Sequence, residues 1–301
     1  MDGSYVAVVG GVNVDIEGQA FAPLIARDSN PGALRISLGG VGRNIAHNLS
    51  LLGIKVELIT ALGSDAWAEH ITEGCRAHGI GLSRSVRAPG ERSSAYLYIS
   101  GPDGDMALAV CDMEIIRHIT PKVIRDNLSF LNSASLVVID GNLSAETVEA
   151  AAELVTAPIL ADPVSVTKAK KFISVLPRLY AIKPNALEAE ALTGEKIPIV
   201  AAEKLVGLGV KKAFVSDGAR GIAAADENGS RLFPAAHANI VNATGAGDAA
   251  TAAIAASLIE SGSLERAALF ALAAGAVAAE SQETVNPLMS RDAIIRKLEN
   301  Y

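Results

Sequence analysis

Cysteine is scarce in this chain of 301 residues, which contains only Cys75 and Cys111. The two lie far apart and form no Cys-x-x-Cys pair, so the sequence offers neither a disulfide framework nor a cysteine-based zinc motif. Free thiols of this kind are typical of a reducing compartment, and we expect a cytoplasmic protein. The first residues carry no positively charged stretch ahead of an apolar segment, so we also expect no secretory signal.

Basic residues are not in excess either. Lysine and arginine number 26 against 33 aspartates and glutamates, which gives a formal net charge of −7. Because no basic stripe is interleaved with aromatic residues, we expect no nucleic acid partner. The almost wholly apolar stretch Ala267–Ala279 is too short for a bilayer and rich in alanine, so we predict a buried helix there and no membrane partner.

What is present is an alternation of short β-rich runs with helical patterns. Half of the residues are apolar, which is enough to fill the core of one large domain, or of one domain with an appendage. Continuous apolar strands separated by helices predict an α/β fold, a three-layer sandwich with a mainly parallel central sheet. The expected strands are 6–9, 56–61, 136–140, 159–162, 181–183 and 213–216, and the expected helices include 44–52, 145–154 and 187–193. Polar residues end four of these strands, at the sheet edge where α/β folds bind ligands: Asp140, Asp162, Lys183 and Ser216.

Two segments, about 12–37 and 93–112, break this pattern. They lack helical periodicity and alternate as strands do, as in Ala95-Tyr96-Leu97-Tyr98-Ile99, and Pro102-Asp103-Gly104-Asp105 supplies a hairpin turn. A small β-sheet near the ligand-binding edge predicts a lid that excludes water from a reaction. A decorative or dimerising flap is the alternative, and one surface can serve both purposes.

The most informative stretch is Asn242-Ala243-Thr244-Gly245-Ala246-Gly247-Asp248. Its two glycines let backbone N–H groups converge, and the start of a long alanine-rich helix adds positive potential where an anion can bind. Asp248, in the first turn, can accept the proton of a hydroxyl while those dipoles hold a developing phosphoryl charge. A glycine turn that opens a buried helix, with the aspartate as a cap, is the structural alternative.

Polar groups near the first strand suit a sugar. Asn13 and Asp15 stand two residues apart on one face of a β segment, where they can bind vicinal hydroxyls, although each is also an ordinary turn or edge residue. Gly39-Gly40-Val41-Gly42-Arg43-Asn44 has Ile45 where a dinucleotide fingerprint needs its third glycine. We interpret it as a glycine turn against which a substrate lies, with Asn44 as a hydrogen-bonding group.

Two motifs in the second half of the chain suit a metal ion and a nucleotide. Asn185 and Glu188 have the spacing of a helix capping box, and their oxygens also suit Mg²⁺ or its waters, so the two roles are compatible. The segment Val215–Gly221 is a strand end followed by a loop with two glycines. Such a loop allows close approach of a nucleotide, but many hairpins have the same pattern.

Four motifs taken together resemble those of the ribokinase-like, or PfkB, carbohydrate kinases: Gly39–Asn44, Asn185–Glu188, Ser216–Gly221 and Thr244–Asp248. The resemblance runs from Val6 to about Pro287. It implies an α/β sandwich with a small β lid, phosphoryl transfer from MgATP to a sugar hydroxymethyl group, and dimers in many members. We therefore expect one ribokinase-like domain over residues 1–301 with both lid segments inserted, a small-molecule nucleoside and ATP as ligands, and a homodimer formed through the lid.

The resemblance also implies roles by position. Asp248 would be the base for the acceptor hydroxyl, and Gly245, Ala246 and Gly247 would form the anion hole. Mg²⁺ would be organised by Asn185 and Glu188. The nucleotide site would comprise Lys168, Asn185, Ser216, Gly218, Gly221 and Asn286, and the substrate would contact Asn13, Asp15, Gly39, Gly40, Arg43, Asn44, Asp112 and Asn142.

Within this family, several local stretches are most similar to the pseudouridine kinases. They are Gly39–Asn44, Asp103–Met106 with Cys111–Met113, Asp162–Ser165 followed by Lys168, and Thr284–Pro287. The acceptor would then be the 5′-hydroxyl of pseudouridine. Kinases of ribose, adenosine, inosine or cytidine in the same family are the alternatives, and a non-catalytic nucleoside sensor is a further one.

The sequence departs from the family pattern around the catalytic motif. The family usually has aspartate where Asn242 stands, and often an aromatic residue soon after the base, where this chain has Ala249 and Ala250. The change at Asn242 bears on the K⁺ site that is customary in the family. Backbone carbonyls near Asn242 and Thr244 remain as candidate ligands, so K⁺ is a candidate cofactor beside ATP and Mg²⁺.

Overall fold

The computed structural model describes residues 4–260, 262–299 and 301, and within them the predicted α/β fold is confirmed. A sheet of nine strands lies at the centre of this part of the chain, in the order β15-β14-β13-β12-β11-β10-β1-β4-β6. The strands from β13 to β6 pair in parallel, whereas β14 and β15 are antiparallel additions at one edge. The strands are β1 Val6–Val9, β4 Val56–Ile59, β6 Ile80–Gly81, β10 Leu136–Asp140, β11 Ile159–Asp162, β12 Ala181–Ile182, β13 Lys212–Ser216, β14 Ile222–Asp226 and β15 Gly229–Phe233.

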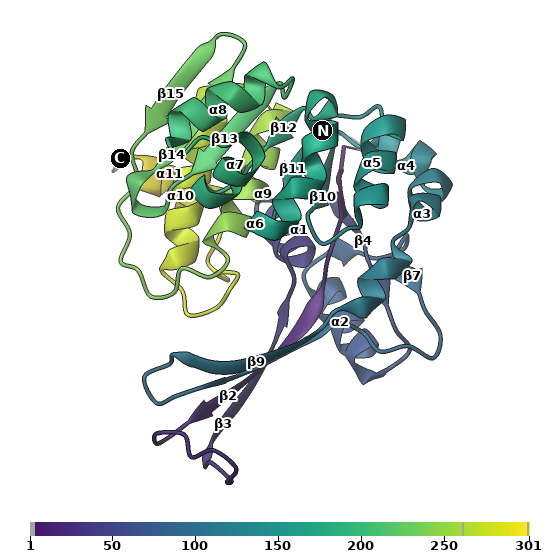
Figure 1. Cartoon of the computed structure of the whole chain (residues 1–301), viewed down its shortest axis with the longest axis vertical. Helices are drawn as coiled ribbons and strands as arrows, with labels where there is room; N and C mark the ends of the chain where they lie inside the picture. Colours follow the sequence, from purple (N-terminus) through teal and green to yellow (C-terminus); the bar gives the residue numbers. More distant parts are fainter. Residues whose placement is uncertain (1–3, 261, 300) are drawn as a thin grey trace.

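Helices cover both faces of this sheet, as Figure 1 shows. Because successive side chains of a strand point to opposite faces, Val6 and Val8 pack into one apolar core while Ala7 and Val9 pack into the other. The first core includes α1 Val41–Leu51, α2 Ala66–Ala77, α9 Ala246–Glu260, α10 Leu264–Ala279 and α11 Arg291–Glu299. The second includes α3 Pro121–Asp126, α4 Leu128–Ser133, α5 Ala145–Leu154, α6 Val166–Ala169, α7 Ala186–Thr193 and α8 Pro198–Gly207. Short 3₁₀ helices lie at Glu114–His118, Lys170–Arg178 and Gly218–Arg220.

The apolar stretch 267–279 is a buried helix, as predicted, because it lies within α10 and packs against the alanine-rich α9. Small side chains let two helices approach closely, so alanine suits both partners. Among the residues that the structure describes, no helix is both long and apolar enough to cross a membrane.

Two predicted elements differ from the structure by more than one residue at an end. The expected strand 56–61 ends as β4 at Ile59, and Ala61–Leu62 forms β5, which pairs with β7 (Val86–Arg87) in a separate small sheet. The expected helix 44–52 begins earlier, at Val41. Gly40 adopts a φ of 93°, which ends the preceding strand and lets the helix start at once.

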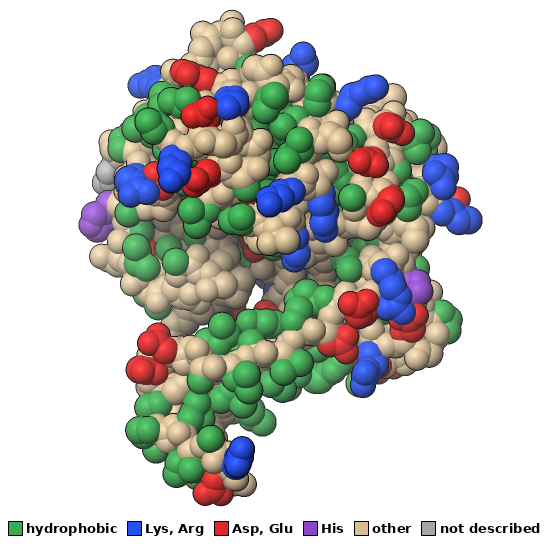
Figure 2. Space-filling view, viewed as in Figure 1, with side chains coloured by type: hydrophobic (Ala, Val, Ile, Leu, Met, Phe, Trp, Pro, Cys, Tyr) green, Lys and Arg blue, Asp and Glu red, His purple; other side chains and the backbone are tan. Residues whose placement is uncertain are grey.

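The two irregular segments form a four-stranded sheet of their own, in the order β3-β2-β8-β9. Its strands are β2 Asn13–Ala20, β3 Gly32–Gly39, β8 Ala95–Ser100 and β9 Met106–Asp112. The predicted turn joins β8 to β9, and Gly104 takes the positive φ of 85° there. Figure 1 shows this sheet projecting from the α/β core, and Figure 2 shows a hollow between the two.

Candidate active site

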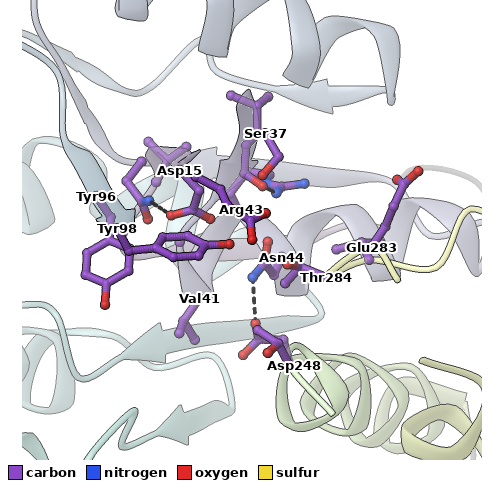
Figure 3. A pocket seen from close by; sticks show the side chains of 18 of the residues that line it. Asp15, Ser37, Val41, Arg43, Asn44, Tyr96, Tyr98, Asp248, Glu283 and Thr284 are labelled. Carbon is purple, nitrogen blue, oxygen red and sulfur yellow. Dashed lines mark hydrogen bonds between the residues drawn. The ribbon is translucent and has the colours of Figure 1, made fainter. Parts of the chain in front are cut away.

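A pocket of about 1160 Å³ lies between the small sheet and the carboxyl end of the parallel strands. Side chains from β2, β3 and β8 line it on the side of the small sheet, and α1, the start of α9 and the loop around Glu283 line it on the side of the core (Figure 3). Open α/β sheets bind ligands at this edge. The sequence-predicted residues that line the pocket are Asn13, Asp15, Gly40, Arg43, Asn44, Asn142, Lys168, Asn242, Thr244 and Asp248.

Asp248 lies at the floor of this pocket, in the first turn of α9. Gly245 directly before the helix has a φ of 83°, and a Cβ there would collide with the carbonyl oxygen of Thr284. The turn therefore requires glycine for two reasons, and it directs the N-terminus of α9 toward the pocket. The Nδ2 of Asn44 in α1 donates a hydrogen bond to Oδ2 of Asp248 at 2.7 Å (Figure 3).

The carboxyl group of Asp248 holds its proton more tightly than an exposed aspartate. Burial, together with the nearby Asp162 carboxylate, raises its pKa from 3.8 to about 7, although the Asn44 hydrogen bond and the Lys183 ammonium act in the opposite direction. A base whose pKa lies near neutral pH combines a useful deprotonated fraction with a strong tendency to accept a proton. The geometry and the pKa of Asp248 therefore both suit general base catalysis.

Charged residues at neighbouring strand ends lie close to Asp248. Nζ of Lys183 lies 3.4 Å from Oδ2 of Asp162, and both side chains are buried. The same Oδ2 accepts a hydrogen bond of 2.6 Å from Thr251, one turn further along α9 than Asp248. Asp140, also buried, accepts from the backbone N–H groups of Gly11 and Asn142.

This group was missed as a site, although the sequence carried a signal for it. The polar residues that end four parallel strands predict a ligand-binding edge, but the sequence alone assigns no role to Asp140, Asp162 or Lys183. The parallel register brings them together, because Asp140 pairs with Asp162 across adjacent strands.

Asn13 and Asp15 form a polar pair on the pocket face of β2. Nδ2 of Asn13 donates to Oδ1 of Asp15 at 2.6 Å, and burial raises the pKa of the Asp15 carboxyl. The carboxylate lies against Gly39, and a Cβ on Gly40 would press on the backbone of Val12. The two glycines therefore allow β3 to pass beside the pair, which leaves its oxygens facing the pocket.

Asn142 and Lys168 form a second polar pair on the opposite side of the pocket. Nζ of Lys168 donates to Oδ1 of Asn142 at 2.6 Å, so the lysine orients the amide. Nδ2 of Asn142 lies near Gly11, at the end of β1. Lys168, a predicted nucleotide contact, lies beside Asn142 in the pocket, whereas Ser216 does not line this pocket.

Arg43 lines the pocket, but its guanidinium nitrogens bond to groups of the protein itself. Its Nη2 donates to the carbonyl oxygen of Leu38, its Nε points to that of Gly39 at 3.5 Å, and its Nη1 lies 3.2 Å from Nδ1 of His47. Burial, His78 and Arg43 lower the pKa of His47 to about 3, so its ring is neutral and accepts this hydrogen bond. Arg43 therefore joins the end of β3 to α1, where the small sheet meets the α/β core. Because Arg43 also lines the pocket, its assignment as a substrate contact stays a prediction.

Two further predicted contacts, Asp112 and Asn286, do not line the pocket. Asp112 pairs with Ala95 on β8, so it lies on the face of the small sheet opposite Tyr96 and does not line the pocket. Asn286 is buried, and its Nδ2 donates to the carbonyl oxygen of Val277 while its Oδ1 accepts from the N–H of Leu288. Its amide therefore ties the end of α10 to the following turn, and Asn286 does not line the pocket.

The Mg²⁺ candidates Asn185 and Glu188 and the loop that begins at Ser216 lie along the same sheet edge but do not line the pocket. Asn185 and Glu188 form the capping box of α7, with reciprocal hydrogen bonds of 2.9 Å. Ser216 forms a β-bridge with Asn185, which sets the 216–221 loop beside the capping box. A Cβ on Gly218 would meet open space. Gly221 is required, because a Cβ there would collide with the carbonyl oxygen of Phe233.

Tyr96 and Tyr98 are pocket residues that the sequence analysis did not select. They occupy successive positions on the pocket face of β8, with ring centroids 5.7 Å apart and planes inclined by 36°. Burial and the nearby Glu17 raise the pKa of Tyr98 to about 12. The alternation 95–99 was the available signal, since period-two spacing puts both rings on one face (Figure 3).

Comparisons with known proteins agree with this architecture. The family model described as pfkB family carbohydrate kinase matches residues 4–291. The chain is similar to a pseudouridine kinase of Escherichia coli, with 32% identity covering 98% of this chain and 97% of the relative. It is also similar to the sugar kinase YeiI of the same organism, with 34% identity over 96% and 82% of the two chains. A solved carbohydrate kinase from Agrobacterium tumefaciens superposes with a TM-score of 0.88 at 26% identity, covering 99% of this chain and 97% of that one.

Proposed function

Because the chain belongs to the pfkB family of carbohydrate kinases, whose members phosphorylate hydroxyl groups of sugars or nucleosides, we propose that it transfers the γ-phosphoryl group of ATP to the 5′-hydroxyl of pseudouridine. The observation that carries this proposal is the position of Asp248. Its carboxylate lies at the pocket floor, at the start of a helix, with a pKa near 7 and Asn44 holding one of its oxygens. That combination suits the removal of a proton from a primary hydroxyl.

In the proposed reaction, Asp248 accepts the proton of the 5′-hydroxyl as the oxygen attacks the γ-phosphorus, and ADP leaves. The backbone N–H groups of Gly245 and Gly247 stabilise the charge that develops on the transferred phosphoryl group, because they are fixed at a helix N-terminus. The N–H of Ala246, the third predicted donor, donates to the carbonyl oxygen of Ala243 at 3.3 Å. Asn13 and Asp15 hold the ribose hydroxyls, and the lid keeps water from competing as the acceptor.

The acidic residues beside Asp248 support a magnesium-dependent donor. Asp162 and Glu188 are buried together with one nearby ammonium group, that of Lys183, so the strand edge carries an excess of potential negative charge. A divalent cation would offset it. Bound Mg²⁺ neutralises charge on the triphosphate. The capping box uses the Asn185 and Glu188 oxygens, so we assign them to Mg²⁺ through their remaining lone pairs or through water.

The lid supports a nucleoside as acceptor more than a free pentose. Tyr96 and Tyr98 present two aromatic rings over the pocket that also contains Asp15, and planar bases stack on such rings. A free sugar would leave this aromatic surface uncovered. Another nucleoside or sugar of the same family remains the second candidate, since the chain is as similar to the sugar kinase YeiI as to the pseudouridine kinase.

The outer face of the lid supports a homodimer. Leu34, Leu97, Leu108 and Val110 lie on the face opposite Tyr96, and each side chain is exposed. Figure 2 shows apolar side chains gathered over this sheet. A second copy of the chain is the occupant that we propose, because an isolated apolar sheet face in water is unfavourable.

An acceptor panel tests the proposed function. ADP release is measured with pseudouridine, uridine, ribose and adenosine at equal concentrations, with ATP and Mg²⁺. We expect turnover with pseudouridine and little with uridine, which differs only in its glycosidic linkage. Turnover with ribose or adenosine but not with pseudouridine would show that the acceptor is another member of the family's substrates. Nucleoside binding without turnover would show that the protein is a sensor and not a kinase.

A further inference from the structure

Asn242 bridges two loops beside the anion hole. Its Nδ2 donates to the carbonyl oxygen of Gln282 at 3.1 Å, and its Oδ1 accepts from the N–H of Thr244 at 2.9 Å. The partners determine the orientation of the amide, since a carbonyl can only accept and a backbone N–H can only donate. The side chain therefore acts as a brace, by which we mean that its two hydrogen bonds hold the Thr244 loop against the Gln282 loop, with the NH₂ group toward Gln282 and the oxygen toward Thr244.

The two loops also touch at other points. The N–H groups of Val241 and Asn242 both point to the carbonyl oxygen of Ala279, at 2.8 and 3.2 Å. Gly245 packs directly on the carbonyl of Thr284. The side-chain bond of Asn242 thus lies between two backbone contacts, and the turn that opens α9 is held against the 279–284 segment at Val241, Asn242 and Gly245.

The K⁺ site that the family resemblance implies does not fit these residues. Such a site needs converging oxygens, which can be neutral carbonyls, and a carboxylate among them strengthens the attraction of the cation. At position 242 the side chain is a neutral amide, and its NH₂ group, which carries partial positive charge, donates to the Gln282 carbonyl oxygen and so occupies a lone pair that a cation could otherwise bind. The amide oxygen is engaged by Thr244. The donor set therefore favours a hydrogen bond over a bound cation.

We propose that the side-chain amide of Asn242 replaces a monovalent cation as the brace of the anion-hole turn, so that this kinase is independent of K⁺. Asn242 is then a positioning residue, which acts on the transferred phosphoryl group through the turn that ends in Gly245. The turnover measurements that test this inference rest on the proposed function. The comparison of unfolding midpoints in the two salts does not rest on it, because thermal unfolding needs no substrate.

The wild-type chain gives the first test. Turnover of the accepted nucleoside is compared in potassium chloride and choline chloride at equal ionic strength, and so is the thermal unfolding midpoint. We expect both quantities to agree, turnover within about twofold, because no cation binds the folded state preferentially. Stimulation by K⁺ of about tenfold or more, or a K⁺-specific rise in the midpoint, would overturn the proposal. Failure of all acceptors would refute the proposed function but leave the unfolding comparison decisive.

The Asn242→Asp variant gives the second test. It replaces the NH₂ donor by a carboxylate oxygen that faces the Gln282 carbonyl, so it breaks the bridge and creates the missing negative charge. We expect kcat in choline chloride to fall by about tenfold, with KM for the nucleoside nearly unchanged, and potassium chloride to restore kcat and raise the unfolding midpoint. Asn239→Asp is the matched control, because it adds the same charge to the same segment at an exposed position. It should neither lower kcat in choline chloride nor make kcat or the unfolding midpoint respond to potassium chloride. Wild-type kcat for Asn242→Asp in both salts would contradict the role of the brace.

Discussion

The amide of Asn44 and the carboxylate of Asp248 are joined by a 2.7 Å hydrogen bond, although the two residues are 204 positions apart in the chain. The bond links α1, which follows directly from the lid strand β3, to the first turn of α9. Lid, helix and base are therefore one connected unit. Changes on either side of the bond should alter the protonation of Asp248.

Replacement of Asp248 by asparagine should lower kcat by about 10²–10⁴-fold, because the variant has no group to take the acceptor proton. The side chain keeps its size, so circular dichroism and the unfolding midpoint should remain those of a folded protein. Asp112→Asn on the outer face of the lid is the matched control and should keep normal kcat. Near-normal turnover by Asp248→Asn would refute the assigned base.

Replacement of Asn44 by alanine should shift the pH profile of kcat/KM. The hydrogen bond from Asn44 lowers the pKa of Asp248, which stands at about 7 with the bond in place. Without the donor the pKa rises, so the base becomes protonated at higher pH and activity on the acid side is lost sooner as pH falls. We expect the acid limb, with a midpoint near 7 in the wild type, to move upward. An unchanged or lower midpoint would show that the bond does not act on Asp248.

Replacement of Lys183 by methionine should reduce the free energy of unfolding by about 3–5 kcal/mol, because it leaves the buried Asp162 carboxylate without its counter-ion. Urea unfolding measures this change. The exposed pair Lys204–Glu195 provides a control, and Lys204→Met should cost at most about 1 kcal/mol. Combining Lys183→Met with Asp162→Asn should recover much of the loss. If the double variant is no more stable than Lys183→Met, the buried pair is not the cause.

Truncation of the lid tyrosines should separate nucleosides from sugars. Tyr96→Ala and Tyr98→Ala each remove a stacking surface, and we expect KM for pseudouridine to rise by about tenfold or more while any activity on ribose stays unchanged. Tyr96→Phe and Tyr98→Phe keep the rings and should stay close to the wild type. Equal losses for ribose and pseudouridine would mean that the rings do not contact a base.

The outer lid face should control the oligomeric state. Leu108→Lys and Val110→Lys place charges on the exposed apolar face that we assign to the dimer, so sedimentation should show a shift from dimer to monomer. Leu232→Lys alters a similarly exposed leucine on β15, away from the lid, and should leave the mass unchanged. A wild-type chain that sediments as a monomer would refute the dimer.

The sequence by itself determined the features that depend on neighbours along the chain. The alternation of apolar strands and helices predicts the sheet, period-two spacing in residues 95–99 predicts a strand of the small sheet, and the glycine turn before Asp248 predicts the start of a helix. Each of these is local, since a few consecutive residues set the backbone conformation and the face of each side chain.

Tertiary structure alone decided which distant groups meet. The register of β8 with β9 placed Asp112 on the outer face, and the packing of β3 against α1 directed the Arg43 guanidinium to the end of β3. The contact of Asn44 with Asp248 depends on where α1 and α9 pack on the same sheet. No local pattern contains that information. The pKa of Asp248 depends on how deeply the side chain is buried and on nearby charges such as Asp162 and Lys183, which come from segments that only folding brings together.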